Sequence, residues 1–351
     1  MKRCRVQMLT VDDARGASTR YRVLAYRPRL EAAGFRTCVR YPLRGPRNAP
    51  FRHLWRALDL ARDLVDPGGD LLFVHRKMYP PRLAARLGAG RRPLVLDMDD
   101  ALDLPPPGKD ADAAVVDRYR RNFEATANAA TLVLCGNREL ASRLPHDRFE
   151  LLPTPIDTAR FRPEALASAG RGKTLGWVGH SDNLAYLEGL GGPMRELTRR
   201  HPGLRLVVVA DQPLRLPGID VEFRRWSLGS ELSCFEGIDI GLMPLADTPW
   251  ARSKCSFKAV QYMALGIPAV ISPVGMNAEV VQDGENGYLP RDDFEWVAAL
   301  DRLLVDEALR ARIGAAGRAR IEAAYSLDVV STRLVSLLER VAGASSHESA
   351  S

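Results

Sequence analysis

The sequence predicts an α/β protein built from two parallel sheets. Short apolar runs alternate with segments of helical periodicity through the first half of the chain, and the same alternation starts again at Lys173. The chain has 351 residues, which is enough for two domains of ordinary size. We therefore expect two Rossmann-like, doubly wound domains that face each other across a cleft, with a ligand held at the carboxyl ends of the strands.

The first half is expected to hold six strands and five helices. The strands cover residues 5–11, 36–41, 71–75, 93–97, 131–135 and 149–152. The helices cover residues 18–33, 51–65, 81–87, 112–129 and 137–142. A proline-rich seam at 151–163 then stiffens the exit from the sheet. The first domain is thus predicted to span residues 1–163.

The second half repeats the pattern without repeating the sequence. Its expected strands are residues 174–178, 204–209, 221–223, 238–243 and 269–271. Its expected helices are residues 183–200, 231–235, 257–264 and 296–304, with further helix after 315. The second domain is predicted to span 164–325, followed by a last amphipathic helix at 326–343. The small, polar tail at 344–351 is expected to be disordered.

Composition and charge narrow the class of partner. With 46% apolar and 26% charged residues the chain has the composition of a soluble globular protein, and five scattered cysteines suggest free thiols in a reducing cytoplasm. Residues 1–150 carry 28 Lys and Arg against 18 Asp and Glu, a net charge of +10, whereas residues 151–351 carry 22 against 25, a net charge of −3. The basic half indicates an anionic partner, such as a phosphorylated acceptor or an anionic membrane. Nucleic acid is not expected, because no nucleic-acid-binding pattern accompanies the charge.

The segment at 254–268 is the most informative part of the chain. Lys254 and Lys258 are two of only six lysines, and they stand four apart at the start of a predicted helix. Residues i and i+4 share a helix face, and a helix N-terminus favours anions. The pair therefore predicts a clamp for a diphosphate, with a solvated helix face as the alternative.

This segment resembles the donor-binding motif of the retaining GT-B glycosyltransferases of family 4, the glycosyl transferases group 1. The usual pattern there is Lys-x-x-Glu-Tyr/Ala-Met-Ala-x-Gly-x-Pro-Val-Ile, followed later by Glu-Val-Val-x-Asp-Gly-x-x-Gly. The matching residues are Lys258, Tyr262, Met263, Ala264, Gly266, Pro268, Glu279, Val280, Val281, Asp283, Gly284 and Gly287. Ser253 and Gln261 depart from the pattern, because the family has there a pair of glutamates that contact the donor.

The resemblance implies a GT-B fold whose C-terminal helix crosses back onto the first domain. It implies metal-independent, retaining transfer of a sugar from a nucleoside-diphosphate sugar (UDP, GDP or dTDP) to a hydroxyl, or alternatively an amine or thiol. No cofactor is expected beyond this co-substrate. The acceptor would be a small molecule or an envelope glycan. Lys258, Lys254 and Gln261 are the implied catalytic residues, with the lysines stabilising the leaving diphosphate.

The donor is expected on the second domain. Gly179 lies in a strand-to-helix turn whose N–H groups at Ser181 to Asn183 could hold a phosphate, although a plain helix cap is nearly as good an interpretation. Trp226 follows a strand and could support a nucleobase. The segment at 246–252 is interpreted as a flexible lid over the donor. The full set of predicted donor-binding residues is Gly179, His180, Ser181, Asn183, Trp226, Ser256, Gly275, Met276, Asn277 and Glu279.

The acceptor is expected on the first domain. Asp97-Met98-Asp99-Asp100 ends a strand; contact with the acceptor, a structural role and a metal site are all open for it, and the prediction is that no metal is bound. Arg20 and Arg22 are interpreted as facing an anion. The predicted acceptor-side residues are Gly16, Arg20, Arg22, His75, Arg76, Asp99 and Asp100. No Ser-His-Asp arrangement is readable from the sequence.

Two other functions stay open at this stage. The departures at Ser253 and Gln261 fit a nucleotide-sugar binding protein that has lost catalysis. The basic first half fits a module that docks on an anionic membrane or on nucleic acid.

Overall fold

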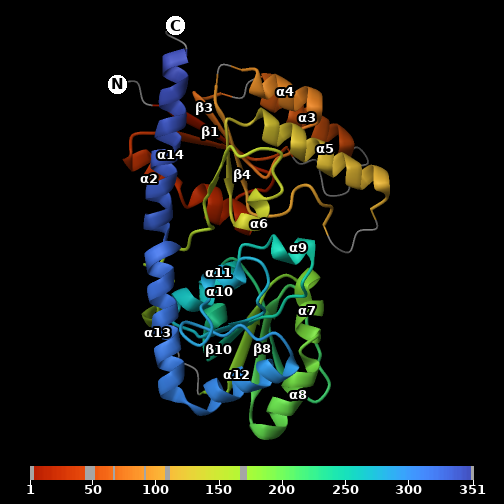
Figure 1. Cartoon of the computed structure of the whole chain (residues 1–351), viewed down its shortest axis with the longest axis vertical. Coiled ribbons are helices and arrows are strands. Elements are labelled where there is room, and N and C mark those ends of the chain that lie inside the picture. The colour runs from red at the N-terminus through yellow and green to blue at the C-terminus, as the bar shows by residue number, and fades with distance from the viewer. Residues whose placement is uncertain are drawn as a thin grey trace. The chain divides into compact units, whose positions relative to one another are not determined.

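The computed structural model describes residues 4–43, 52–65, 68–90, 92–106, 111–166 and 172–348. It forms two compact units, one of residues 1–155 with 327–351 and the other of residues 156–326 (Figure 1). The first division lies at Pro155/Ile156 rather than after residue 163. The reason is that the seam packs on the second unit: Ile156 N–H donates to Tyr325 O across 2.9 Å, and Arg318 donates to Phe161 O across 3.0 Å.

Unit 1 contains a parallel six-stranded sheet of order β2-β1-β3-β4-β5-β6. Its strands are β1 (Arg5–Leu9), β2 (Arg36–Arg40), β3 (Leu71–His75), β4 (Leu94–Met98), β5 (Leu132–Cys135) and β6 (Phe149–Leu151). Its helices are α1 (Ala17–Thr19), the π-helix η1 (Arg20–Leu24), α2 (Arg27–Ala32), α3 (Arg52–Val65), α4 (Pro81–Gly88), α5 (Ala113–Ala129), α6 (Arg138–Ala141) and α14 (Leu327–Glu348). Strand order reverses between β1 and β3, which is where α/β sheets bind ligands.

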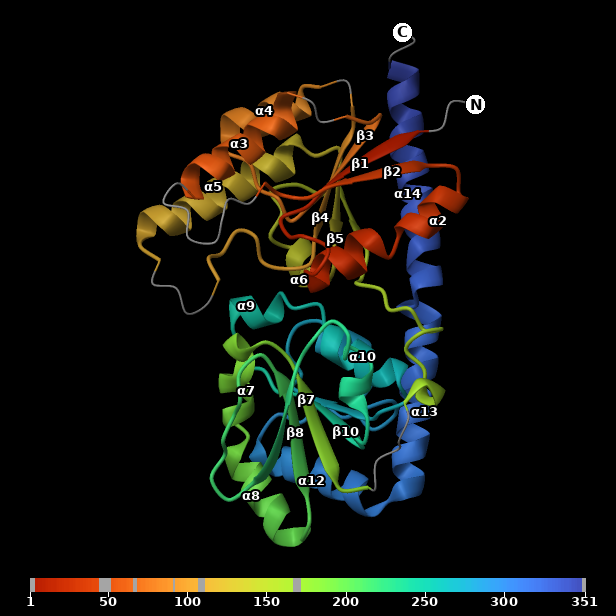
Figure 2. The ribbon, with the colours of Figure 1, turned by 180° about the vertical axis from the view of Figure 1, so that it is seen from behind.

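Helices cover both faces of this sheet. The C-terminal helix α14 and α2 pack on one face, where Leu334 and Leu338 join the core of Met8, Phe73 and Leu134. Helices α3, α4 and α5 lie together on the other side (Figure 2). The C-terminal helix therefore belongs to the first unit, as predicted.

Unit 2 contains a parallel five-stranded sheet of order β11-β10-β7-β8-β9. Its strands are β7 (Thr174–Val178), β8 (Arg205–Ala210), β9 (Asp220–Arg225), β10 (Ile240–Met243) and β11 (Ala269–Ile271). Its helical elements are η2 (Pro163–Ala165), η3 (Ser181–Asn183), α7 (Leu184–Glu188), α8 (Gly191–Arg200), η4 (Ser233–Phe235), α9 (Pro249–Arg252), α10 (Phe257–Ala264), α11 (Asn277–Val280), α12 (Asp293–Val305) and α13 (Glu307–Ala324). Here the order reverses between β7 and β10.

The buried Tyr262 of α10 fixes this reversal point. Its hydroxyl accepts from Val178 N–H at 3.1 Å on β7 and lies 3.2 Å from Leu242 O on β10. Its ring occupies the space over Gly241, where a Cβ would come within 2.3 Å of the ring. The glycine and the tyrosine together seat α10 against the two strands that flank the expected ligand position.

All eleven predicted strands are present, and the structure corrects several helices. The helix expected at 18–33 is divided by the π-turn, in which Ala25 N–H donates to Arg20 O across 2.9 Å. The helix expected at 183–200 is divided between Glu188 and Gly191, and the segment predicted as a lid holds α9, capped by Thr248. Helix α14 continues to Glu348, so the disorder expected for the tail was wrong for residues 344–348, which contain neither proline nor glycine; residues 349–351 lie outside the described residues.

Candidate functional site

The carboxyl ends of the unit 2 strands form one edge, and the predicted donor residues gather on it. Gly179 follows β7, Trp226 follows β9, and Gly275 and Met276 lie in the turn after β11. Helix α10, between β10 and β11, brings Lys258 to the same edge.

Lys258 lies over the buried ring of Trp177, with its Nζ 5.3 Å from the ring centroid. Its stem also crosses Gly179, where a Cβ would come within 2.8 Å of the lysine Cε and 2.5 Å of Trp177. Burial, and then repulsion from Lys254, lower the pKa of Lys258 to about 7. Within the described residues no carboxylate lies within ion-pair distance of this ammonium group. Lys258 is therefore a cation whose charge the fold itself leaves uncompensated.

Lys254 is near Lys258 but is not on its helix. The chain leaves α9 at Arg252, and α10 begins only at Phe257, so the predicted i, i+4 pairing on one helix was wrong. Ser256 breaks the helix because its φ of +51° is left-handed. Lys254 instead lies over Trp250, with its Nζ 6.0 Å from the ring centroid. Repulsion from Lys254 is the smaller cause, after burial, of the lowered pKa of Lys258.

The start of α10 is held in a strained geometry. Ser256 Oγ donates to Asn277 Oδ1, and Asn277 Nδ2 donates to Ser272 O across 2.8 Å. Gly275 has a φ of +56°, and a Cβ there would meet Arg252 O at 2.2 Å. These contacts tie the N-terminus of α10 to the turn after β11, and strain of this kind concentrates at functional sites.

The turn at 179–183 does not form the predicted phosphate cradle. Ser181 N–H donates to Asp211 Oδ1 at 2.8 Å, and Gly179 N–H donates to Val209 O at 2.9 Å. Asp182 N–H reaches His180 Nδ1, and Asn183 N–H reaches His180 O. These N–H groups are used inside the fold. The predicted cap by a Ser, Asp or Asn side chain is not formed either, because His180 caps η3 and Asn183 makes no side-chain cap bond to α7. Gly179 contributes space for Lys258 rather than a phosphate contact.

The other predicted donor residues differ in exposure. Ser253 and Gln261 are the two residues that depart from the family pattern. Ser253 is fully buried, so its side chain cannot reach a ligand in this structure, whereas Gln261 is 9% exposed. Met276 and Asn277 are buried, His180 and Glu279 are exposed, and Trp226 is half-buried. The structure thus brings Lys258, Ser256, Gly275 and Asn277 together, and leaves His180 outside this group.

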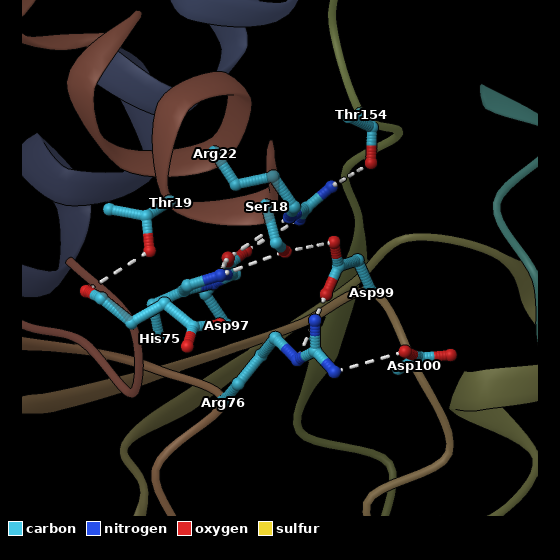
Figure 3. Close-up of polar contacts among 10 residues, drawn as sticks. Ser18, Thr19, Arg22, His75, Arg76, Asp97, Asp99, Asp100 and Thr154 are labelled. Atoms are coloured by element: carbon cyan, nitrogen blue, oxygen red, sulfur yellow. Dashed lines mark hydrogen bonds and ion pairs between the residues drawn. The ribbon is translucent and has the colours of Figure 1, made fainter. Parts of the chain in front are cut away.

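Unit 1 gathers polar side chains at the carboxyl ends of β1, β3 and β4 (Figure 3). Arg22, on the π-turn, is fully buried; its Nε and Nη2 donate to Asp97 at 3.0 and 2.5 Å. Its Nη1 donates to Leu152 O and to Thr154 Oγ1. Burial opposes the charge of Asp97, but Arg22 and His75 together lower the pKa of this carboxyl. Arg22 therefore neutralises an internal carboxylate, and its predicted role of facing an anionic acceptor was wrong.

His75 is also fully buried, so its predicted place in contact with the acceptor was wrong as well. Its Nδ1 lies 2.7 Å from Asp97 Oδ2, and its Nε2 lies 3.0 Å from Ser18 Oγ. Ser18 in turn donates to Asp99 Oδ2. The sequence showed no Ser-His-Asp arrangement because Ser18, His75 and Asp97 come from three separate elements, α1, β3 and β4. Ser18 was missed; its position before the π-turn was the only signal.

The outer part of this cluster holds the remaining acceptor-side candidates. Arg76 has a left-handed φ of +57°, and its guanidinium pairs with Asp99 at 3.5 Å and Asp100 at 3.0 Å. Arg20 is half-buried beside the ring of Tyr21. Gly16 leaves room for Asp12, since a Cβ there would approach Asp12 Cβ to 2.7 Å.

The Asp-x-Asp motif is not arranged for a metal ion. Both oxygens of Asp97 accept hydrogen bonds from Arg22 and His75, and Asp99 is bound by Ser18 and Arg76. No group of three or more His, Cys, Asp or Glu side chains suited to a metal occurs in the described ranges. Across the same ranges, no helix combines the length and the apolar character needed to span a bilayer.

Both units are Rossmann-like and gather polar side chains at their strand reversal points, and comparison with known proteins shows what the chain is similar to. Residues 172–306, which lie in unit 2, match the family model "Glycosyl transferases group 1". The chain is 29% identical over 202 residues to a D-inositol 3-phosphate glycosyltransferase of Stackebrandtia nassauensis, covering 49% of this chain and 44% of that protein. It is 27% identical over 218 residues to a GDP-mannose-dependent monoacylated alpha-(1-6)-phosphatidylinositol monomannoside mannosyltransferase of Corynebacterium glutamicum, covering 55% of this chain and 57% of that protein. The chain thus spans about half the length of these relatives.

Solved structures show the same fold. Sucrose-phosphate synthase from Thermosynechococcus elongatus aligns with a TM-score of 0.74 at 16% identity, covering 97% of this chain and 100% of that one. Anabaena Alr3699/HepE, in complex with UDP and glucose, aligns with a TM-score of 0.68 at 14% identity, covering 96% of this chain and 100% of that one. The chain therefore has the two Rossmann-like domains of the GT-B glycosyltransferases.

Proposed function

We propose that this chain is a retaining, metal-independent glycosyltransferase of family 4 that moves a sugar from a nucleoside-diphosphate sugar to a hydroxyl group. The observation that carries the proposal is Lys258. It is a cation without a carboxylate partner among the described residues, placed at the strand reversal of a glycosyl transferases group 1 domain. Such a group gains most when negative charge grows on a leaving diphosphate.

The donor end of the reaction belongs to unit 2. Lys258 and Lys254 supply positive charge, and α10 directs its N-terminus to the same edge. Gln261 is the third residue we assign to the donor, with Ser256, Gly275, Met276 and Asn277 shaping the edge around it. UDP is the first donor nucleotide to test, because Alr3699/HepE binds it, and GDP follows from the mannosyltransferase relative.

The acceptor belongs to unit 1, at the outer part of the cluster formed by Asp99, Asp100 and Arg76. The two relatives act on an inositol phosphate and a phosphatidylinositol mannoside, so a small polyol or a glycolipid is the acceptor class to test. We further propose that the protein works in the cytoplasm.

Turnover of purified protein tests the function and separates it from the main alternative. Thermal shift with UDP, GDP and dTDP identifies the nucleotide, and release of that nucleotide from its sugar conjugates, with and without polyol acceptors, measures transfer. A glycosyltransferase releases nucleotide faster when an acceptor is present. Stabilisation by nucleotide without any turnover would instead identify a binding protein that has lost catalysis, as the substitution of Ser253 and Gln261 for the glutamate pair allows.

Nucleotide binding should weaken as pH rises through about 7, the pKa of Lys258. Below this pKa the ammonium is charged and attracts a diphosphate; above it, binding must first return a proton to the lysine. Calorimetric titration with the diphosphate between pH 6 and 9 measures this slope. Lys258→Arg keeps its charge over the whole range and should flatten the slope; an equal slope in both proteins would contradict the assignment.

One surface of unit 1 supports peripheral contact with an anionic membrane. Helix α3 directs Asp59 and Asp63 inward to the buried Lys77, so its apolar face is turned outward. Leu54, Leu58 and Val65 on that face are 55%, 45% and 84% exposed. An amphipathic helix on a basic domain is suited to an anionic lipid surface.

Co-sedimentation with phosphatidylglycerol vesicles tests this contact. Leu54→Ser with Leu58→Ser should reduce the bound fraction several-fold, because the apolar face is lost. Leu228→Ser, which changes an equally exposed leucine of unit 2, serves as the control. Equal binding by all three proteins, or binding only to neutral vesicles, would contradict the proposal.

A further inference from the structure

Four side chains of unit 1 form a hydrogen-bonded chain from the interior to the surface (Figure 3). Asp97 and His75 have no exposed area, Ser18 is half-buried, and the Asp99 side chain retains 13% exposure. The chain runs from Asp97 Oδ2 to His75 Nδ1, from His75 Nε2 to Ser18 Oγ, and from Ser18 Oγ to Asp99 Oδ2.

Asp97, His75 and Ser18 contact one another in the order found in a nucleophilic triad. The contact of Ser18 with Asp99 changes where the hydroxyl proton of Ser18 lies. In a nucleophilic triad the serine donates its proton to the histidine. Here the single hydroxyl proton of Ser18 is donated to Asp99. The contact between Ser18 and His75 then requires His75 Nε2 to be the donor, while Nδ1 donates to Asp97. His75 therefore carries a proton on both ring nitrogens, and Ser18 is not activated as a nucleophile.

The resulting charges fix Asp99 as an anion. Burial opposes ionisation of this carboxyl, but the charges of Arg76, His75 and Arg22 outweigh it and lower the pKa of Asp99 to about 2. Such a carboxylate stays ionised at neutral pH, so it accepts hydrogen bonds and donates none. A carboxylate has about four lone-pair directions, and the Asp99 side chain keeps 13% exposure, so it can also accept a ligand hydroxyl.

The arginines of the cluster are already neutralised. Arg22 pairs with Asp97, and Arg76 pairs with Asp99 and Asp100. With protonated His75, three cations balance the carboxylates of Asp97, Asp99 and Asp100, so the cluster offers no net positive charge for an anion. What it offers a ligand is carboxylate oxygens, which accept from the hydroxyls of a neutral polyol.

We propose that Asp99 binds a hydroxyl of a neutral, polyhydroxylated part of the acceptor, and that Ser18 and His75 are positioning residues that hold Asp99 for this contact. The inference rests on the proposed function, since it concerns the acceptor of the same reaction. It adds Ser18 to the site and assigns the chemistry of the group that Asp99 recognises.

Nitrogen NMR of the full chain tests the proton count without any substrate. The chain has six histidines, and His75→Gln assigns the His75 signals in protein labelled with ¹⁵N-histidine. We expect both ring nitrogens of His75 to be protonated. In Asp99→Asn the amide can donate to Ser18, the Ser18 hydroxyl then turns to His75, and Nε2 should lose its proton. An unprotonated nitrogen in the wild type, or no change in Asp99→Asn, would overturn the assignment.

Acceptor kinetics test the role. With monosaccharides and myo-inositol as probes, Asp99→Asn and Ser18→Ala should raise the acceptor KM about 10-fold or more, the loss expected for a hydrogen bond to a charged group. Ser18→Thr keeps the hydroxyl and should restore the KM. Nucleoside diphosphate affinity, measured on the same proteins, reports on unit 2 alone.

The outcomes separate the two proposals. A wild type that binds no nucleotide and shows no transfer would refute the proposed function. The NMR experiment would still show whether both ring nitrogens of His75 are protonated, because it needs no substrate. Transfer only to phosphorylated acceptors, with a KM insensitive to Asp99→Asn, would refute the hydroxyl-binding role and leave the glycosyltransferase standing.

Discussion

Replacing Lys258 by Ala should lower kcat/KM for sugar transfer about 10³-fold, the effect of removing a preorganised group that stabilises developing negative charge. The ammonium lies against Trp177 without a carboxylate partner among the described residues, so a bound diphosphate would be its first strong counterion. Rates with the preferred nucleotide sugar and acceptor, measured for the wild type and the variant, check the prediction. Near-normal turnover would remove Lys258 from the mechanism.

This loss should occur without loss of the fold. The pKa of Lys258 is lowered from 10.5 to about 7, so the folded state disfavours the charged lysine. Below pH 7 both states are protonated and the fold bears the full cost of the buried charge. Between about pH 7 and 10.5 the unfolded chain binds more protons, so wild-type stability rises with pH. Lys258→Met should be at least as stable as the wild type at pH 6, with a smaller rise above pH 7.

Replacing Arg22 by Ala should lower the free energy of unfolding of unit 1 by about 3–5 kcal/mol, the range for breaking a buried ion pair. Asp97 would keep its buried charge and lose two hydrogen bonds, while Leu152 O and Thr154 Oγ1 would lose their donor. Urea denaturation followed by a unit 1 probe measures the change.

Arg29 offers a matched control for Arg22. It also pairs with an aspartate, Asp328, but the two side chains are 35% and 79% exposed. An exposed pair contributes about 0–1 kcal/mol, so Arg29→Ala should change stability little. Equal effects of the two variants would show that Arg22 is not the buried anchor described above.

The strands were predictable because each combines a continuous apolar run with a turn at its end. In parallel sheets buried on both faces, such runs depend on local sequence alone. The breaks within helices were not predictable in this way. The π-turn at Arg20–Leu24 carries Arg22, whose partner Asp97 lies far along the chain and gives no signal near residue 20. The left-handed Ser256 likewise depends on Asn277 and on the turn after β11.

The candidate site residues also divide into those that local sequence identifies and those that depend on contacts distant in the chain. Lys258 was identifiable because its motif is local and its position on α10 follows from the helix. Arg22 and His75 were placed at the right strand ends, but their burial depends on Asp97 and could not be read from residue type. Ser18 had only its place near the start of the first predicted helix to mark it, because its two partners come from β3 and from the turn after β4. Prediction from sequence thus located the edges of both sheets, but it did not show that Arg22 and His75 are buried there.

A crystal structure of the chain with its preferred nucleoside diphosphate is the most direct test of the whole account. We expect a phosphate oxygen within about 3.2 Å of Lys258 Nζ, the distance of a charge-assisted hydrogen bond. Electron density for the diphosphate away from the edge formed by Lys258, Ser256 and Gly275 would contradict it.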